Sequence, residues 1–528
     1  AMLYGDSVKK VKGEKMRYRS LIIWAVLLSA VATAQEPPKS QLKKMVRDYR
    51  KAYEHELFTE LVEWLTIPNV ADDQPNIRRC AAWLKAAMEK RGITTQILET
   101  GGSPVVYGEL KVPGAKRTVM YYAHYDGQPV DPTKWIDMAP FSPTLRPAKL
   151  EAGSTEPKPI PMPKKGESIN EEWRLYGRSA SDDKSPITAL LAAMDAVKAA
   201  GIEYGANLKF IYEGEEEAGS PFLQSFAEKN RELFDAEVLY VCDGPMYYSN
   251  QPTLKFGARG ITTIDITVYG PNVNVHSGHY GNWAPNPGIK LARLLTSMKH
   301  ENGNVKIRGF YNTVTPLSKR EKDAVKAIPP YDDEIKELYG FAKPEGRGES
   351  LMERINKPSL NIRGLESAWA GPQARTVVPA EATAAIDIRL VKGNDPDDMI
   401  SKVIDHVKRQ GFHVVSEDPD HATRMKYPDI AKIVKREGYP ASRTSMDLEI
   451  SYLTAEALTG FHDEPVVMVP TSGGSVPLYI FTQILDVPTI SVPIVNHDNN
   501  QHQPNENIRI GHYWQGIETL AALLVYVK

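Results

Sequence analysis

The chain has 528 residues, more than one ordinary folding domain requires. Hydrophobic residues make up 42% of it and charged residues 25%, a composition typical of globular proteins and unlike that of disordered or collagen-like chains. A net charge of −2 lacks the strongly basic character of nucleic-acid-binding proteins. We therefore expect a globular protein that does not bind nucleic acid.

The first 34 residues have the pattern of a secretory leader. Two arginines precede the apolar run 21–31, and small residues at 32–34 form a cleavage site. The run is short for a membrane span, so we expect a signal peptide cleaved near Ala34 and no stable membrane span in the mature chain. An uncleaved anchor is the alternative. The predicted location is secreted, in the bacterial periplasm, with Met16 as the natural start and no chemistry in residues 1–15.

Helical patterns and short apolar runs alternate along the next part of the chain. Helices are predicted over Gln41–Leu65 and Asn76–Arg91, and the Pro-, Lys- and Glu-rich region 143–170 is predicted to be a long surface loop. Buried strands are predicted at the apolar runs Thr118–Ala123, Leu208–Tyr212, Val238–Cys242 and Val487–Val495. The two cysteines, Cys80 and Cys242, do not indicate a disulfide framework.

Side chains that bind metals follow each of these apolar runs. His124-Tyr125-Asp126 ends the first run, and the acidic cluster Glu213-Gly214-Glu215-Glu216-Glu217 ends the second. Asp243 follows the third run, and His502 follows the fourth after an Asn-rich loop. The carboxyl ends of parallel strands share one edge of a sheet, so we expect these side chains to lie together. Packed carboxylates need a cation to neutralise them, which predicts a metal site.

A fifth ligand candidate, Asp182, stands in the segment Gly177–Pro186, just before a predicted helix over Ile187–Ala200 that Gly201 ends. Each candidate also has a simpler explanation. A lone histidine at a strand end is more often a hydrogen-bonded core residue, and a run of glutamates is usually a solvated helix face. Glu215 is the member of its cluster that we expect to be solvated only.

The pattern changes after Gly257-Ala258-Arg259-Gly260, where a smaller α+β domain is predicted to be inserted. Its predicted elements are strands over Thr262–Tyr269 and Ala382–Leu390, a helix over Pro287–His300 capped by Asn286, and a helix over Pro396–Gln410 closed by Gly411. The expected boundaries are a leader over 1–34, a catalytic domain over 35–261 and 419–528, and a lid domain over 262–418.

Together the motifs resemble the M20 family of co-catalytic zinc peptidases, above all its dipeptidase and carboxypeptidase branches, which include carnosinase-like and glutamate-carboxypeptidase-like enzymes. The motifs are His124-Tyr125-Asp126, Gly177-Arg178 with Asp182-Asp183-Lys184, Glu213 to Ser220, Asp243, and His502 near Asn505-Glu506. They occur in the family's order over nearly the whole mature chain. The resemblance implies a zinc-exopeptidase-like α/β fold with a central, mostly parallel sheet and an inserted α+β lid domain that forms a homodimer.

The resemblance also implies a centre of two Zn²⁺ ions per subunit, with Mn²⁺ or Co²⁺ as alternative metals. Its implied members are His124, Asp182 and Asp243 at one ion, Asp182, Glu217 and His502 at the other, Glu216 as the general base on a metal-bridging water, and Asp126 as the partner of the His124 ring. The peptide bond between Asp182 and Asp183 is expected to be cis.

Further residues are assigned to substrate recognition by the same resemblance. His276 would stabilise the oxyanion in the partner subunit's active site, and Arg389 would bind a substrate carboxylate. Thr376, Gly474 and Ser475 match other substrate contacts. Without the family, a loop hydrogen bond for His276 and a surface ion pair for Arg389 are the simpler interpretations. The segment 445–452 lacks the histidine that dipeptidase relatives often place there.

Three functions are therefore compared. The first is a secreted or periplasmic metallopeptidase that hydrolyses dipeptides or a terminal peptide bond. The second is an N-acyl-amino-acid amidohydrolase with the same metals and a different pocket, and the sequence does not separate it from the first. The third, a catalytically dead peptide-binding protein, is disfavoured because Glu216 and all five ligand positions are intact.

Overall fold

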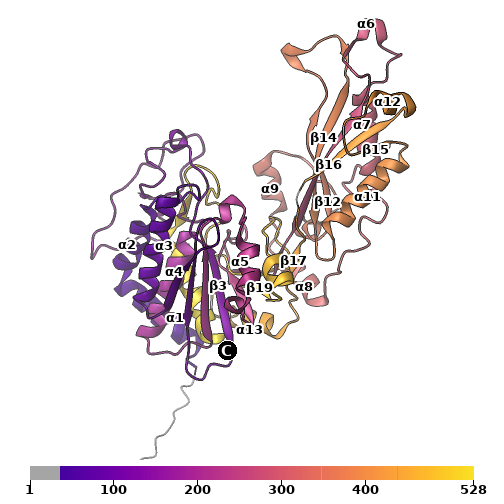
Figure 1. The fold of residues 1–528 in the computed structure, drawn as a ribbon. Helices are drawn as coiled ribbons and strands as arrows, with labels where there is room; N and C mark the ends of the chain where they lie inside the picture. Colours follow the sequence, from indigo (N-terminus) through magenta and orange to yellow (C-terminus); the bar gives the residue numbers. More distant parts are fainter. Residues whose placement is uncertain (1–35, 347, 437) are drawn as a thin grey trace, which may run out of the picture. The chain divides into compact units, whose positions relative to one another are not determined.

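The computed structural model describes residues 36–346, 348–436 and 438–528. The leader, with its predicted cleavage site near Ala34, lies outside these ranges. Residues 38–528 form one unit that contains two large β-sheets (Figure 1). Within the described part of the chain, no helix combines the length and the apolar character that crossing a membrane requires.

The larger sheet has the strand order β1-β2-β6-β3-β7-β19-β8-β18. Its central strands β6, β3, β7 and β19 run parallel, whereas β1 and β2 at one edge pair antiparallel and β8 meets β19 antiparallel. The bounds are β1 Thr94–Leu98, β2 Val105–Leu110, β3 Thr118–His124, β6 Asn207–Glu213, β7 Val238–Val241, β8 Thr253–Lys255, β18 Val467–Val469 and β19 Thr489–Ser491. The sheet is therefore mixed, with the expected parallel arrangement at its centre.

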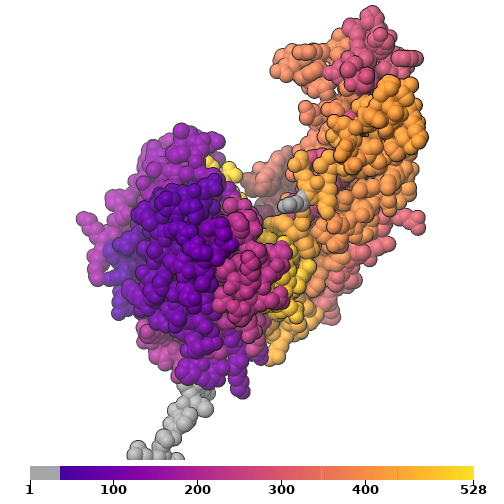
Figure 2. Space-filling model, in the orientation of Figure 1, coloured from indigo at the N-terminus to yellow at the C-terminus, as the bar shows by residue number. Residues whose placement is uncertain are grey.

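Both faces of the central strands are buried, which explains their nearly continuous apolar sequences. Along β3, Tyr121 and its alternate neighbours pack into the core under one layer of helices, and Tyr122 packs into the core on the opposite face. The first layer consists of α1 Lys39–Ala52, α2 Glu54–Leu65, α3 Gln74–Glu89, α4 Lys184–Ala199, α13 Glu449–Leu458 and α14 Ile510–Tyr526. Figure 2 shows the N-terminal helices, in indigo, at the surface. The opposite face is covered by α5 Leu223–Lys229 and the π-helical turn η5 Ile480–Ile484.

The first predicted helix divides into α1 and α2 at Tyr53. The later helices agree with their predictions to within a few residues. The carboxylate of Asp73 accepts a hydrogen bond from the Asn76 backbone N–H at the start of α3, and Gly201, at φ +68°, follows α4.

The smaller sheet has the order β12-β14-β10-β16-β15. Its strands are β10 Gly260–Tyr269, β12 Ser359–Glu366, β14 Glu381–Leu390, β15 His413–Val415 and β16 Ile430–Lys435, and α7 Pro287–Met298 and α11 Pro396–Arg409 share its apolar core. Asn286 caps α7 as predicted. The strand β16 pairs with β10, and Ala431 packs into the same core, so this sheet extends beyond the boundary expected at residue 418.

The described chain also contains shorter strands and helices. They are β4 Thr144–Arg146, β5 Arg174–Tyr176, β9 Gly257–Ala258, β11 Val275–His276, β13 Val377–Val378, β17 Ser442–Arg443, β20 Asn507–Arg509, α6 Ser277–Tyr280, α8 Lys319–Ala327, α9 Asp332–Tyr339, α10 Leu351–Ile355 and α12 His421–Lys426. Apart from β4 and a bridge at Ile160, the region 143–170 is irregular, as predicted. Cys80 and Cys242 are both buried and free.

Candidate metal centre

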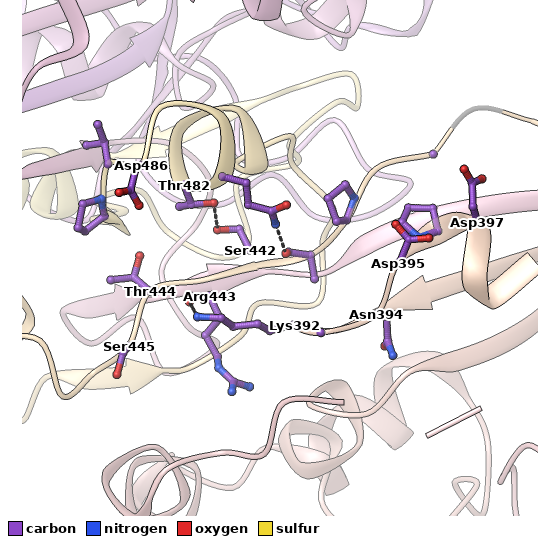
Figure 3. A pocket seen from close by; sticks show the side chains of 18 of the residues that line it. Lys392, Asn394, Asp395, Asp397, Ser442, Arg443, Thr444, Ser445, Thr482 and Asp486 are labelled. Atoms are coloured by element: carbon purple, nitrogen blue, oxygen red, sulfur yellow. Dashed lines mark hydrogen bonds between the residues drawn. The ribbon is translucent and has the colours of Figure 1, made fainter. Parts of the chain in front are cut away.

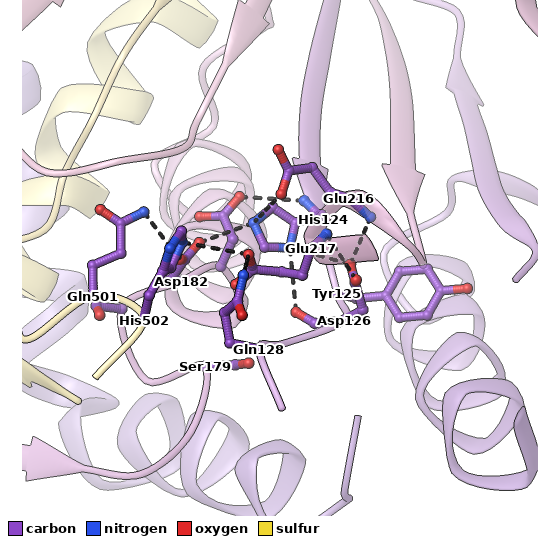
Figure 4. Close-up of polar contacts among 12 residues, drawn as sticks. His124, Tyr125, Asp126, Gln128, Ser179, Asp182, Glu216, Glu217, Gln501 and His502 are labelled. Carbon is purple, nitrogen blue, oxygen red and sulfur yellow. Dashed lines mark hydrogen bonds and ion pairs between the residues drawn. The ribbon is translucent and has the colours of Figure 1, made fainter. Parts of the chain in front are cut away.

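The central parallel strands bring the predicted ligands to one edge of the larger sheet. His124 is the last residue of β3, Glu217 lies in the turn η2 Glu216–Ala218 that follows β6, and Asp243 comes two residues after β7. Asp182 lies in the turn before α4, and His502 lies in the loop between β19 and β20. Side chains from five separate segments therefore meet in one place, as the strand-end pattern predicted, and Figure 4 shows four of them, His124, Asp182, Glu217 and His502.

The five side chains form two groups that share Asp182. The groups are His124, Asp182 and Asp243, and Asp182, Glu217 and His502, and within each group one ligand atom per residue lies within 4.8 Å of the others. Asp182 Oδ1 is 2.9 Å from His124 Nε2, whereas Asp182 Oδ2 is 3.1 Å from His502 Nε2. One carboxylate thus turns a different oxygen toward each histidine, which is the arrangement expected of a residue that bridges two cations.

Negative charge accumulates in this buried site. Burial raises the pKa of Glu217 to about 7, and the neighbouring Asp182 carboxylate adds to the shift. Burial and Asp182 likewise raise the pKa of Asp243. Burial alone would lower the pKa of His124, but its hydrogen bonds with Asp126 and Asp182 raise it well above the ordinary value. Carboxylates that repel one another in a site of low polarity are stabilised when divalent cations bind.

The donor set fits two divalent cations of the zinc type. It consists of imidazole nitrogens and carboxylate oxygens without a thiolate, a combination that is typical of catalytic rather than structural zinc sites. His502 adopts φ +61°, a backbone conformation uncommon for residues other than glycine and frequent at functional sites. The peptide bond between Asp182 and Asp183 is cis, as the resemblance implied.

Asp126 connects the histidine to the acidic cluster. Its Oδ1 is 3.3 Å from His124 Nδ1, the ring nitrogen that faces away from Asp182. The same carboxylate accepts hydrogen bonds from the backbone N–H groups of Glu216, at 3.1 Å, and Glu217, at 3.0 Å. Asp126 therefore fixes both the ring of a candidate ligand and the turn that carries Glu216 and Glu217.

The Glu216 carboxylate lies beside the ligand groups without belonging to either. Its Oε2 is 3.9 Å from His124 Nε2. Burial raises its pKa well above the ordinary value, and the carboxylates of Asp243 and Asp182 contribute to the shift, partly opposed by His124. A buried carboxylate with a raised pKa next to a cation-binding centre has the properties of a general acid and base.

Glu215 is not the solvated residue that we expected. Only 6% of its surface is exposed, and its carboxylate accepts a hydrogen bond of 3.0 Å from the Ser103 backbone N–H. The prediction was wrong because this partner is 112 positions away in the sequence, in the loop before β2.

Three further residues support the centre, and the sequence analysis assigned a role to none of them. The Glu506 carboxylate is fully buried and accepts hydrogen bonds from the Ser179, Ser181 and Asp182 backbone N–H groups and from the Arg178 side chain. Gln501 Nε2 donates to Asp182 Oδ2 at 2.9 Å, and Gln128 Nε2 donates to Glu217 Oε2 at 2.7 Å. Their only sequence signal is proximity to a motif: Gln501 precedes His502, and Gln128 follows Asp126 by two positions.

A cavity of about 690 Å³ adjoins the centre and contains part of the predicted substrate site. Asp243, His502, Arg389, Gly474 and Ser475 all line it. Arg389, on β14 of the smaller sheet, donates from Nη1 to Ser475 Oγ at 2.6 Å, and its Nε is 3.6 Å from the Asp387 carboxylate. A guanidinium group therefore faces the same space as the metal-ligand candidates.

His276 and Thr376 lie together, but not in this cavity. The Ser277 backbone N–H donates to the Thr376 carbonyl oxygen at 3.0 Å, and the short strands β11 and β13 pair beside them. The His276 side chain is exposed, and its Nδ1 accepts a hydrogen bond from the Gly278 backbone N–H at 3.0 Å. The structure thus divides the predicted substrate residues between the cavity and an exposed part of the smaller domain.

Another cavity, of about 1000 Å³, contains none of the candidate ligands (Figure 3). Ser445 and Leu448, from the segment where a histidine was noted as missing, line it. Two of its cationic side chains contact the protein: Lys392 Nζ donates to the Arg443 carbonyl oxygen at 2.7 Å, and Arg443 Nε is 3.3 Å from Glu321. This cavity therefore lacks the ligand groups of the metal centre.

Comparisons with known proteins agree with this geometry. Residues 120–526 match peptidase family M20/M25/M40. Cys-Gly metallodipeptidase dug1 of Schizosaccharomyces pombe is 27% identical over 88% of this chain and 94% of its own length, and human Beta-Ala-His dipeptidase is 26% identical over 96% of each chain. The crystal structure of the M20 family metallo-carboxypeptidase Sso-CP2 from Sulfolobus solfataricus superposes with a TM-score of 0.69 at 27% identity, covering 89% of this chain and 99% of that one.

Proposed function

The chain belongs to peptidase family M20/M25/M40 and is a metal-dependent hydrolase, and we propose that it is a two-zinc peptidase that hydrolyses dipeptides or a terminal peptide bond. The observation that carries this proposal is the pair of ligand groups that share Asp182, next to Glu216 and to a cavity that contains Arg389. The relatives named above, two dipeptidases and a carboxypeptidase, support the choice of a peptide substrate.

In the proposed enzyme, His124, Asp182 and Asp243 would hold one zinc ion and Asp182, Glu217 and His502 would hold the other. When bound, the two ions supply positive charge that lowers the pKa of water and polarises the scissile carbonyl group. Asp126 keeps the His124 ring oriented through Nδ1, and Gln128 and Gln501 hold carboxylate oxygens of Glu217 and Asp182 in place.

Glu216 moves the proton in this mechanism. Its carboxylate takes a proton from the water as the water oxygen forms a C–O bond with the scissile carbonyl carbon. It then gives that proton to the amide nitrogen, which leaves as the amine when the C–N bond breaks. A carboxyl group with a raised pKa suits the second step, because it holds the proton until the amine nitrogen accepts it. Arg389 fixes the substrate by pairing its planar guanidinium with the carboxylate of the C-terminal residue.

We further propose a homodimer formed through the smaller domain, in which His276 and Thr376 of each subunit complete the partner's site. In the described sheet, β12 is an edge strand, and its Ile362 and Leu365 are 42% and 66% exposed. The segment that carries His276 also has exposed apolar side chains, Val273 at 60% and Trp283 at 82%. Exposed hydrophobic groups next to an unpaired strand edge favour association with another chain.

The leader pattern supports a third proposal, that the protein is exported and cleaved near Ala34. Expression of the full chain in a bacterial host, followed by fractionation and N-terminal sequencing, tests it directly. A full-length protein that stays in the cytoplasm would contradict it.

The decisive experiment for the activity is a substrate panel. Dipeptides, longer peptides and N-acyl amino acids are incubated with the protein loaded with zinc, with manganese or with no metal. We expect metal-dependent release of amino acids from dipeptides or from a peptide terminus. Cleavage of N-acyl amino acids alone would instead identify an amidohydrolase, and no cleavage of any substrate would overturn the proposed activity.

A further inference from the structure

One cation in the cavity beside the metal centre has no established role. Lys255 is the last residue of β8, in register with Ser491 of β19, which in turn pairs with Val241 of β7. Val241 is the residue two positions before Asp243, so Lys255 lies across β19 from the end of the strand that precedes Asp243. Its neighbours Leu254 and Phe256 belong to the core under the helical layer, so the Lys255 side chain projects from the opposite face of the sheet, where it lines the cavity.

The Lys255 ammonium group is incompletely satisfied by the protein. Its Nζ donates one hydrogen bond, to the Pro245 carbonyl oxygen at 2.7 Å, and no ion pair joins it to a carboxylate of the described chain. An ammonium group has three donors. Burial lowers its pKa to about 8, partly opposed by the negative charge of Asp243. A half-buried cation without a bound anion costs free energy, which an anionic ligand in the cavity would recover.

The rest of the cavity wall is consistent with an amino-acid side chain that is apolar along its length and charged at its end. Arg389 and Ser475 lie in the same wall as the metal-ligand candidates Asp243 and His502. Apolar groups fill much of the remaining lining, among them Tyr247, Met352 and Val469. A ligand that fills this space thus meets two cationic side chains, one from each sheet.

We propose that Lys255 is a specificity-determining residue that binds the side-chain carboxylate of an acidic C-terminal residue of the substrate, glutamate or aspartate. This inference rests on the proposed peptidase function. If Arg389 binds the α-carboxylate and the scissile bond lies at the metal centre, the side chain of the C-terminal residue occupies the cavity between them. The methylene groups of glutamate then contact the apolar lining, and its carboxylate pairs with Lys255.

A purely structural role for Lys255 makes a different prediction. If Lys255 only donates a hydrogen bond to the Pro245 carbonyl group, it stabilises the segment after Asp243. Its loss would then lower the turnover of all substrates by the same factor. Lys209 on β6 provides a matched control, because its Nζ also donates to a backbone carbonyl oxygen, that of Glu232, at 3.0 Å and it does not line the cavity.

The test compares kcat/KM of the zinc-loaded protein for Ala-Glu, Ala-Gln and Ala-Leu. Glutamine has the shape of glutamate without its charge, so the Glu/Gln ratio isolates the contribution of the cation. We expect the parent to favour Ala-Glu over Ala-Gln by about 10- to 100-fold, the range for a hydrogen bond to a charged group. Lys255→Met should bring this ratio close to one while Ala-Gln cleavage persists, Lys255→Glu should favour Ala-Lys, and Lys209→Met should keep the parent's ratio.

The outcomes separate the inference from the function on which it rests. A parent that cleaves Ala-Gln or Ala-Leu at least as well as Ala-Glu overturns the role of Lys255 but not the peptidase activity, and this result requires no variant to fold. The role of Lys255 is likewise overturned if Lys255→Met lowers all three values equally, with zinc content and thermal stability unchanged. A parent that cleaves no peptide overturns both.

Discussion

The Glu216 carboxylate is close enough to His124 to act at the metal centre, yet it is absent from both ligand groups. We expect Glu216→Gln to retain both metal ions and to lose activity by about 10²- to 10⁴-fold, the range observed when a general base is removed. Metal analysis together with turnover of the parent's best substrate tests this prediction.

Glu215 offers a matched control for that variant. An amide oxygen at position 215 can still accept the hydrogen bond from the Ser103 backbone N–H, so Glu215→Gln should keep most of the activity. Loss of both metals in Glu216→Gln, or equal losses of activity in the two variants, would show that Glu216 acts as a ligand or as a structural residue.

Two buried histidines predict how stability depends on pH. Burial lowers the pKa of His512 to about 3, with Arg509 adding to the effect, and lowers that of His462 to about 4. In the unfolded chain such groups take up protons below a pH of about 6.5. Between pH 6.5 and 4 the unfolded state therefore binds more protons than the folded state, and the free energy of unfolding decreases as the pH falls.

Replacement of His512 by glutamine should weaken this dependence. For each pH unit in the window, the decrease in the free energy of unfolding should be smaller by up to about 1.4 kcal/mol than in the parent. Urea unfolding of both proteins at pH 7, 6 and 5 in the same metal buffer measures this difference. The contribution of the metal ligands to the pH dependence is the same in both proteins and cancels in the comparison. Parallel pH profiles would contradict the assignment.

At the scale of elements, the turn that carries Asp182 depends on a residue more than three hundred positions away. Glu506, just before β20, accepts hydrogen bonds from the Ser181 and Asp182 backbone N–H groups and pairs with Arg178 at 2.7 Å. In Glu506→Gln, the side-chain NH₂ group, itself a donor, would face the N–H donors that bond to the Glu506 carboxylate in the parent. We expect zinc affinity to fall by about 10- to 100-fold, as for other residues that orient a ligand.

A competition assay with a zinc chelator measures this affinity, and Glu172→Gln serves as its control. Glu172 also pairs with an arginine, Arg509, but its side chain is 67% exposed and lies outside the metal centre. Unchanged zinc affinity in Glu506→Gln would show that the turn holds its shape without the carboxylate.

The difference between local patterns and long-range hydrogen bonds explains which elements the sequence predicts. Thr118–Ala123 and its counterparts are recognisable because both faces of a central strand are buried, and their ends place His124 and Asp243 at one edge. Glu215 and Glu506 could not be assigned in this way, because hydrogen bonds with Ser103 and Arg178 join segments far apart in the chain. A local pattern indicates which residue ends a strand, whereas its long-range partner becomes visible only in the fold.

The strand β16 illustrates the same limit for domain boundaries. Its assignment to the smaller sheet depends on pairing with β10, whose residues precede it by more than 160 positions. The register of Ile266 with Ile433 and of Val268 with Ala431 extends this sheet past the boundary predicted at residue 418.

At the scale of the whole molecule, the separation of His276 from the cavity makes the proposed dimer part of the mechanism. His276→Ala should still bind zinc and dimerise, because its side chain is exposed and its hydrogen bond is local, to Gly278. If the imidazole stabilises the oxyanion at the partner's site, turnover should fall by about 10²- to 10³-fold. His279→Ala, at the exposed neighbour whose ring centroid lies 4.7 Å away, should retain turnover.

Mixing His276→Ala with Glu216→Gln then distinguishes action across the interface from action within one subunit. In a hybrid dimer, the subunit that carries His276→Ala keeps its own Glu216 and receives His276 from its partner, so one of the two sites is intact. Activity should therefore reappear in a mixture of two inactive proteins once subunits have exchanged, which mass spectrometry of isotope-labelled subunits verifies independently. If exchange is complete and the mixture stays as inactive as either variant, His276 does not act in trans, and the exposed surface around Trp283 needs another explanation.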